Sequence, residues 1–388
     1  MGLAHSPQIS TDSLILCLDI GNKFKTVYST SHNFLQNGSF DGGLGVTYES
    51  GSNPTNTIVE LKNPGETNYV LRQNGSNTEY QMNIDGGAQG TLSASTQYVM
   101  SGWYSTSDDY NGGNTMFHAR AFSSSNSHSS TGNGMGTLLY SVEIGGLTWE
   151  YRYQSIITPS DYNGDFDWYM GYGTSNSTGY RYYTGLKVEE GAFPSLFDLS
   201  RNSNDGKAYL GTSYDSSNNG SIVFNGSNGH IITGLTRGDL GNTLTIVVWY
   251  KYTGSSNRTY TAIIGGKESG TGTEFFIGKN TGNTNIGVQD GNYSSTFVTG
   301  SNAFDGNWHQ IVYTYDSGTG KIYLDGTLKS SGSFTKCNDA EEIMIGIEFE
   351  GSNYPFLGNM SQILMYTRVL TAAEVAQNFN ALRGRYGI

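Results

Sequence analysis

Cysteine, proline and charged residues are all scarce in this sequence, which has 388 residues but only 2 Cys, 6 Pro and 14% charged residues. Cys17 and Cys337 lie too far apart for a CxxC metal site, and two cysteines cannot form a dense disulfide framework. We interpret both as buried thiols, with a disulfide between them as the alternative. Because disordered chains are usually poor in aromatics and rich in charge or proline, a chain with 13% aromatic residues should be folded.

Basic residues are also few, with 21 Lys and Arg against 33 Asp and Glu and a net charge of -12. Phosphate binding needs clustered Lys and Arg, so nucleic acid is not an expected partner, and an acidic membrane surface is disfavoured likewise. Apolar runs such as Leu14–Leu18 are far shorter than the roughly 18 residues of a membrane-spanning helix, so no membrane insertion is expected. The first dozen residues lack a secretory signal, so we expect a mature chain or one that leaves its cell by another route, such as inside a virus particle.

Glycine and aromatic residues are abundant, with 54 Gly, 28 Tyr, 17 Phe and 5 Trp. Almost the whole chain consists of short β-branched or aromatic runs between Gly, Asn, Ser and Asp clusters, for example at residues 243–250 and 310–315. This pattern is typical of antiparallel sandwiches, and the length suggests two domains. The strand at 321–324 is followed by Asp325-Gly326, which favours a type I′ hairpin.

One helix is predicted, from Ala372 to about Arg383. Thr371 is its expected N-cap, and Glu374, three residues later, completes a capping box. One apolar stripe is expected to lie on a sheet, formed by Val375, Phe379 and Leu382.

Several motifs occur in order after Phe197: Asp198–Gly206, Ser221–Asn228, Asp305–Tyr315, Ile322–Gly326 and Phe356–Tyr366. Together they resemble the laminin-G-like, concanavalin-type jelly roll. The resemblance implies a fold and leaves the chemistry open. Trp308 and Tyr323 fall on strands whose alternate residues face inward, so we expect both in the core.

The strand that normally opens such a jelly roll resembles Thr11–Asn22, yet the turn that should follow it occurs only at Asp198. We therefore predict that residues 1–32 and 194–388 form one discontinuous sandwich and that residues 33–193 are an inserted domain, since insertion at an exposed loop is tolerated.

The insert resembles carbohydrate-binding modules of the galactose-binding-like jelly-roll group at Asn33–Asp41, Gln97–Tyr104 and Tyr182–Gly191, and its ending is similar to that found in phage tail and other virion proteins. The predicted fold class is all-β, with two antiparallel jelly-roll sandwiches, one of them discontinuous, and a single C-terminal helix.

Catalytic patterns are absent from the sequence. The glucanase relatives place carboxylates at ExDxE spacing on one strand face, whereas this chain offers only the pairs Glu348-Phe-Glu350 and Asp165-Phe-Asp167, and such pairs most often face solvent. There is no HxH or HExxH pair, no GxSxG elbow and no GxxxxGK loop. We therefore predict that the protein is not an enzyme.

No cofactor is predicted apart from a structural calcium ion, which both resembled families often carry. Asp41 matches the early acidic ligand of the module family, but the usual late aspartate is replaced around Thr184-Gly185. In the laminin-G-like part, spacing does not decide among Asp205, Asp239 and Asp290.

Recognition of sugars is the remaining chemistry, because Tyr and Trp faces stack on sugar rings and nearby polar groups bond the hydroxyls. The alternatives are that these aromatics are core residues or anchor protein interfaces. The candidate ligand-binding residues are Trp149, Tyr151, Tyr153, Trp168, Tyr180 and Tyr182.

The favoured hypothesis is a phage virion structural protein, on a tail fibre or decorating the capsid surface, that recognises host-surface glycans or contacts other virion proteins and is a homo-oligomer. One alternative is a secreted carbohydrate-active enzyme or its binding modules. Another is a capsid cement protein without glycan affinity.

Overall fold

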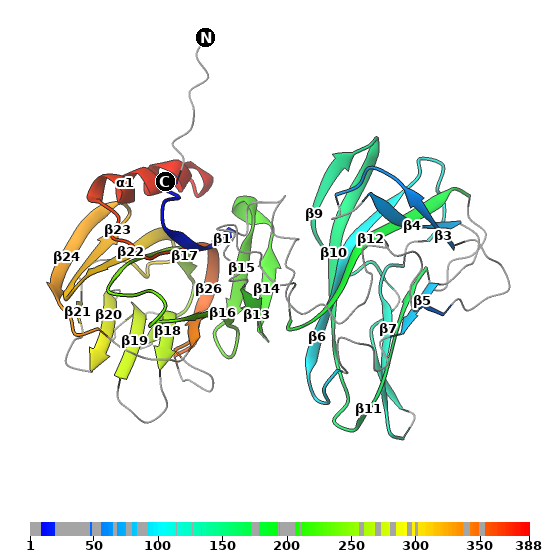
Figure 1. The fold of residues 1–388 in the computed structure, drawn as a ribbon, viewed down its shortest axis with the longest axis horizontal. Coiled ribbons are helices and arrows are strands. Elements are labelled where there is room, and N and C mark those ends of the chain that lie inside the picture. The colour runs from blue at the N-terminus through cyan, green and yellow to red at the C-terminus, as the bar shows by residue number, and fades with distance from the viewer. Residues whose placement is uncertain are drawn as a thin grey trace, which may run out of the picture. The chain divides into compact units, whose positions relative to one another are not determined.

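A computed structural model describes residues 9–19, 47–48, 56–64, 68–74, 80–83, 92–113, 115–125, 127–132, 134–171, 178–192, 194, 206–209, 211–255, 260–267, 273–279, 285–292, 297–298, 302–336, 342–348 and 354–388. The chain forms two compact units (Figure 1). Unit 1 comprises Met1–Ser29 and Ser195–Ile388, and unit 2 comprises Thr30–Pro194. Among the described residues, no helix has the length and apolar character needed to cross a bilayer.

Unit 1 contains two antiparallel sheets that pack face to face. The eight-stranded sheet has the order β14-β15-β26-β17-β22-β23-β24, with β1 beside β26. Its strands are β1 (Leu14–Asp19), β14 (Thr212–Asp215), β15 (Ser221–Asn225), β17 (Thr243–Tyr252), β22 (Trp308–Asp316), β23 (Thr319–Leu324), β24 (Thr327–Ser333) and β26 (Leu357–Tyr366). The seven-stranded sheet contains β13 (Lys207–Ala208), β16 (Ile231–Thr236), β18 (Thr261–Lys267), β19 (Thr273–Lys279), β20 (Ile286–Asn292), β21 (Phe297–Val298) and β25 (Glu342–Ile345). Tyr313 and Phe275, one from each sheet, have ring centroids 6.5 Å apart in the core.

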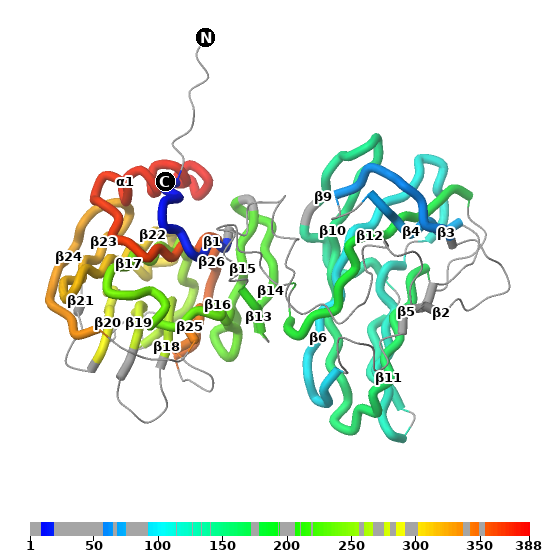
Figure 2. The backbone as a smooth tube through the Cα atoms, in the orientation of Figure 1, coloured from blue at the N-terminus to red at the C-terminus, as the bar shows by residue number. Residues whose placement is uncertain are grey.

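The N-terminal strand belongs to unit 1, where β1 and β15 lie one after the other along the same edge of β26 (Figure 2). β1 pairs with residues 362–366 of β26, and β15 pairs with residues 357–360. Leu16 and Leu18 of β1 have no exposed surface. A strand from the start of the chain therefore completes a sheet built otherwise from its C-terminal half.

The helix α1 (Ala372–Leu382) covers the face of the eight-stranded sheet that points away from the seven-stranded sheet (Figure 1). Val375 packs there with Val247, Val312 and Leu364. The predicted capping box is present, because the Thr371 side chain accepts from the backbone N–H of Glu374 and the Glu374 carboxylate accepts from that of Thr371. The helix prediction is confirmed, and α1 is the single α-helix in the described part of the chain.

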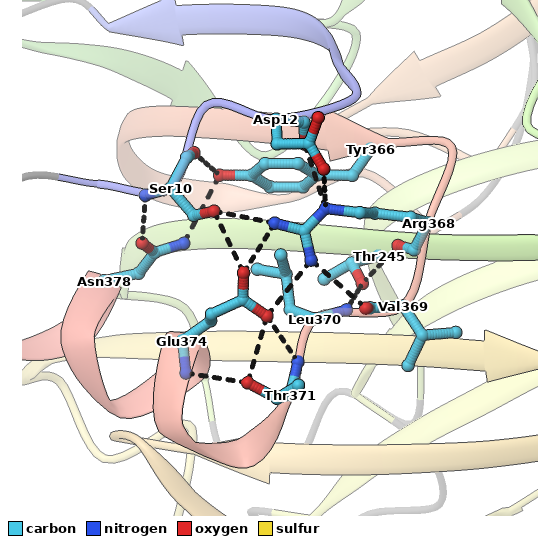
Figure 3. Close-up of polar contacts among 10 residues, drawn as sticks. All are labelled: Ser10, Asp12, Thr245, Tyr366, Arg368, Val369, Leu370, Thr371, Glu374 and Asn378. Carbon is cyan, nitrogen blue, oxygen red and sulfur yellow. Dashed lines mark hydrogen bonds and ion pairs between the residues drawn. The ribbon is translucent and has the colours of Figure 1, made fainter.

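A polar network joins residues 10–12 to the segment around α1 (Figure 3). The guanidinium of Arg368 donates to both carboxylate oxygens of Glu374, at 2.6 and 3.0 Å, and to the hydroxyl of Ser10 at 2.8 Å. The backbone N–H of Ser10 donates to the Asn378 side chain, and the Tyr366 hydroxyl donates to the Ser10 carbonyl. These bonds hold the start of β1 against the C-terminal helix.

Unit 2 also consists of two antiparallel sheets. The six-stranded sheet, in the order β3-β4-β12-β6-β10-β9, contains β3 (Asn56–Glu60), β4 (Tyr69–Asn74), β6 (Gln97–Thr106), β9 (Thr137–Ile144), β10 (Leu147–Ile157) and β12 (Tyr180–Glu190). The five-stranded sheet contains β2 (Thr47–Tyr48), β5 (Tyr80–Asn83), β7 (His118–Ser123), β8 (His128–Ser130) and β11 (Tyr162–Met170). One hydrophobic core, with Met100 and Tyr183 from the first sheet and Phe166 and Ala119 from the second, fills the space between them.

The predicted fold class is confirmed: the described chain is almost entirely β, its sheets are antiparallel, and its one α-helix is C-terminal. Asp325 and Gly326 both have positive φ, 51° and 73°, in the hairpin between β23 and β24. Trp308 and Tyr323 are buried, as expected. Cys17 is buried too, whereas Cys337 lies outside the described residues.

Candidate functional site

The face of the six-stranded sheet that points away from the core of unit 2, here called the outer face, carries most of the predicted aromatic residues. Successive side chains of a strand point to opposite faces, so Tyr104 and Tyr183, which lie in the core, place Trp103 and Tyr182 on the outer face. Tyr151 is directly opposite Trp103 on β10, so Trp149, Tyr151 and Tyr153 share that face. The aromatics predicted from three separate stretches of sequence therefore gather on one surface.

Three of these rings form a row across β12 and β10. The centroids of Tyr180 and Tyr182 are 6.4 Å apart, and those of Tyr182 and Trp149 are 6.3 Å apart. β6 lies between β12 and β10, and its residue beside Tyr182 is Ser105. Because the Ser105 side chain is small, it leaves room for the rings of Tyr182 and Trp149 to approach each other. Exposure falls along the row: Tyr180 is 37% exposed, Tyr182 is half-buried and Trp149 is fully buried.

Arg72 of β4 adds a cation to this row. It is opposite Tyr182 in the strand register, and its guanidinium carbon lies 4.7 Å from the centroid of the Tyr180 ring. Its Nε donates to the Thr57 hydroxyl at 3.2 Å, which fixes the plane of the guanidinium. We call Arg72, Trp149, Tyr180 and Tyr182 the aromatic site.

Several polar atoms at the aromatic site have no hydrogen-bond partner among the residues that the structure describes. The Trp149 indole N–H is buried and has no acceptor. Within the described part of the chain, neither the hydroxyls of Tyr180 and Tyr182 nor the terminal nitrogens of Arg72 make a hydrogen bond. Trp149 has no exposed surface, so the groups that a ligand can reach are the hydroxyls of Tyr180 and Tyr182 and the terminal N–H groups of Arg72. These groups suit a ligand that offers several acceptors and hydroxyls.

Burial raises the pKa of the Tyr182 phenol above its usual value, and the opposing charge of Arg72 is too weak to reverse the shift. The charge of Asp109, in the loop after β6, raises it further. Tyr182 therefore stays protonated at neutral pH and can both donate and accept a hydrogen bond.

Trp168 lies elsewhere, between the two sheets. It has no exposed surface, its ring stacks on Phe117 at 5.6 Å, and its indole N–H donates to the Met116 carbonyl at 2.8 Å. The structure thus places Trp168 in the core and gives it no surface to offer a ligand.

Tyr151 and Tyr153 lie on the outer face but are buried, with exposed fractions of 2% and 8%. The Tyr151 hydroxyl donates to Ser101 at 2.9 Å, and burial, together with the charge of Glu189, raises its pKa. These two rings therefore belong to the buried part of the outer face and offer a ligand little surface.

The proposed metal ligand Asp41 lies outside the described residues. Among the residues that the structure describes, no group of three or more His, Cys, Asp or Glu side chains could hold a metal ion. Of the acid pairs, Asp167 is buried and accepts from the Tyr169 hydroxyl at 3.0 Å, while Glu348 is buried and Glu350 is not described.

Two residues near the aromatic site were not predicted from the sequence. Trp103 could have been found, because its strand alternates core and outer residues and its ring lies 5.2 Å from that of Tyr151. Arg72 had no local signal, because its place depends on the pairing of β4 with β12, more than 100 positions later.

A profile of the Concanavalin A-like lectin/glucanases superfamily matches residues 224–376, all within unit 1. No curated protein sequence is significantly similar to the chain.

Among solved structures, the binding domain of Paraclostridial Mosquitocidal Protein 1 is similar at 18% identity and a TM-score of 0.39, covering 48% of this chain and 49% of that one. Domain 4 of AbnA, a GH43 extracellular arabinanase from Geobacillus stearothermophilus solved with arabinotriose, is 19% identical with a TM-score of 0.38, covering 47% of this chain and 91% of that domain. A mutant Trypanosoma rangeli sialidase is 16% identical with a TM-score of 0.41, covering 51% and 32%. The chain thus spans about half the length of the first of these structures.

Proposed function

We propose that this protein recognises glycans without catalysing a reaction on them, and that the aromatic site of unit 2 is where it does so. The observation that supports this most directly is that Tyr180 and Tyr182 are at least partly exposed and lie in a row with Trp149. Their hydroxyls and the terminal nitrogens of Arg72 make no hydrogen bond within the described part of the chain. A sugar ring can stack on an exposed tyrosine face, and its hydroxyls can supply the missing acceptors.

We further propose that the chain is carried on a phage virion, on a tail fibre or the capsid surface, in contact with other virion proteins. This proposal rests on the resemblance of residues 33–193 to modules of such proteins. One exposed tyrosine with a half-buried neighbour supports only weak binding, so attachment to a host surface would need several copies acting together. A homo-oligomer or a many-copy array is the arrangement that such avidity requires.

The test is glycan binding by an oligomeric sample of the full chain, compared with a Tyr180→Ala/Tyr182→Ala double variant. We expect the double variant to bind at least tenfold more weakly, which corresponds to about 1.4 kcal/mol of lost stacking and hydrogen bonding. The matched control is Tyr69→Ala, because Tyr69 has the same 37% exposure but shares the opposite sheet face with Leu71. Binding should not change on addition of EDTA, since none of the four residues of the aromatic site is a carboxylate of the kind that binds calcium.

Absence of binding to any glycan on a broad array, with normal adsorption of particles that carry the double variant, would contradict the proposal and favour a capsid cement protein. Release of reducing sugar by the wild-type chain would instead favour a carbohydrate-active enzyme.

A further inference from the structure

The charges of unit 2 are strongly unbalanced, although its aromatic site contains a cation. Residues 30–194 contain 15 Asp and Glu but only 6 Lys and Arg. A surface with this excess repels anions at distances up to the Debye length, about 8 Å at physiological salt. Arg72 is therefore one of few cations in an acidic unit.

A carboxylate lies next to the exposed end of the site. The Ser107 hydroxyl donates to Asp109 Oδ1 at 2.6 Å and accepts from the backbone N–H of Tyr180 at 2.7 Å. A Cβ atom at Gly179 would lie 2.7 Å from the same carboxylate oxygen, so Asp109 is packed directly against the residue before Tyr180. Thr178 fixes the loop further by donating to the Asp109 carbonyl at 2.7 Å.

The two charged groups near Tyr180 offer opposite hydrogen-bonding roles. Among the described residues, the terminal N–H groups of Arg72 have no acceptor, and they can only donate, whereas the Asp109 carboxylate can only accept. A sugar hydroxyl both donates and accepts, so two hydroxyls of one uncharged sugar can satisfy both groups. A sugar carboxylate or sulfate could bond Arg72, but the negative charge of Asp109, which like that of Arg72 acts on the Tyr182 phenol, would oppose it.

From this pairing of Arg72 with Asp109 beside Tyr180, we infer that the aromatic site selects uncharged glycans over their sialylated or sulfated counterparts. The inference rests on the proposed function, because it names the class of glycan that the same site takes. Arg72 is then a hydroxyl-binding residue, and Asp109 has two roles: it accepts a hydrogen bond from neutral sugars and repels acidic ones.

The experiment measures the affinity of the full-length chain for matched oligosaccharides: lacto-N-neotetraose, its α2,3-sialylated and α2,6-sialylated forms, and galactan oligosaccharides with and without sulfate. We expect each neutral member to bind at least tenfold more tightly than its charged partner at 0.15 M salt. Asp109→Asn should narrow this ratio at least threefold, because the amide keeps an acceptor oxygen for Ser107 and removes the charge. The matched control is Asp108→Asn, an exposed acid in the same loop, which should leave the ratio unchanged.

Tighter binding of the charged members, lost in Arg72→Gln, would overturn the inference while leaving glycan recognition at this site intact. An unchanged ratio in Asp109→Asn would overturn the role of Asp109. If neither the neutral nor the charged members bound, and the broad array also gave no binding, the proposed function itself would fail.

Discussion

His309, at the start of β22, is half-buried and bridges two carboxylates with its two ring nitrogens. Nδ1 lies 2.8 Å from Asp325 in the β23–β24 hairpin, and Nε2 lies 3.1 Å from Asp305 in the loop before β22. Only the protonated ring can donate to both. Burial alone lowers the pKa of His309, but the hydrogen bonds and charges of Asp325 and then Asp305 outweigh it, so the pKa lies above its usual value.

We expect unit 1 to become less stable as the pH rises, because the hydrogen bonds from His309 to Asp305 and Asp325 need the protonated ring. Because the pKa of His309 is raised on folding, its stabilisation is fully present below about pH 6.5, the value in an unfolded chain, and is lost as the pH rises through the folded pKa. His309→Gln should be less stable than wild type at pH 6 by about 1.5–3 kcal/mol, the usual range for hydrogen bonds to charged groups. Chemical unfolding at pH 6, 7, 8 and 9 should show this difference shrinking.

If the difference in unfolding free energy between wild type and His309→Gln stayed constant from pH 6 to pH 9, protonation of His309 would not contribute to stability. His128→Gln is a suitable control, because His128 is an exposed residue on the edge strand β8 of unit 2.

At the level of single residues, sequence alone identifies the aromatic site only in part. Trp149, Tyr180 and Tyr182 were predicted because aromatic residues in a Tyr-rich strand region suit sugar stacking, and the structure places them in one row. The same reasoning also selected Trp168, and only the packing shows that its indole faces Met116 and Phe117. Residue type alone does not distinguish the two faces of a strand when both are buried.

Among the elements, α1 depends on one ion pair as well as its apolar stripe. Arg368 and the backbone N–H of Thr371 hydrogen-bond Glu374, and Arg368 lowers the pKa of Glu374 from 4.5 to about 2, although partial burial opposes the shift. The same carboxylate accepts from the Ser10 hydroxyl at 3.2 Å, so one side chain holds both the helix start and the chain before β1 (Figure 3).

Replacing this carboxylate by an amide, Glu374→Gln, should lower the free energy of unfolding of unit 1 by about 1 kcal/mol at pH 7, the usual value of a helix cap. Because the folded pKa is depressed, the contribution is present above about pH 4.5 and is lost as the pH falls towards 2. Urea unfolding at pH 7 and pH 2.5 should therefore show a smaller difference at the lower pH. Glu342→Gln, an exposed acid on β25, should have no effect at either pH, and an equal effect of both variants would disprove the cap.

Local elements are the part of the fold that the sequence predicts best. The hairpin at Asp325-Gly326 and the capping box of α1 are both formed by residues within four positions of one another. The order of strands in a sheet is different, because no local pattern states that β26 lies between β15 and β17. That order depends on side-chain packing between distant segments, which no local pattern reports.

At the scale of the whole molecule, unit 1 is built from two segments of the chain, and each of its described strands pairs with another strand of unit 1. Deleting residues 33–193 and joining the ends with a short Gly/Ser linker should leave a folded sandwich, since the cost of loop closure depends only weakly on loop length. Calorimetry of this variant should show one cooperative transition. A chain of residues 194–388 alone is the informative comparison, because it lacks β1 and the buried Leu16 and Leu18, and it should melt at a lower temperature or not cooperatively.

If the linked variant showed no cooperative transition, unit 1 would depend on unit 2 for its stability. If the chain without β1 were equally stable, the pairing of β1 with β26 would contribute little.

The position of β1 along β26 also constrains how the protein is made. Leu14 leaves the ribosome early, but its partner Tyr366 follows about 350 residues later. At translation rates of about 5–20 residues per second, the β1 strand waits roughly 20–70 s before it can pair. During that time unit 2 can be completed, while an apolar strand, Leu-Ile-Leu-Cys-Leu, stays exposed on the nascent chain. Slowing translation after unit 2 should therefore lengthen the period in which the strand can aggregate or engage a chaperone.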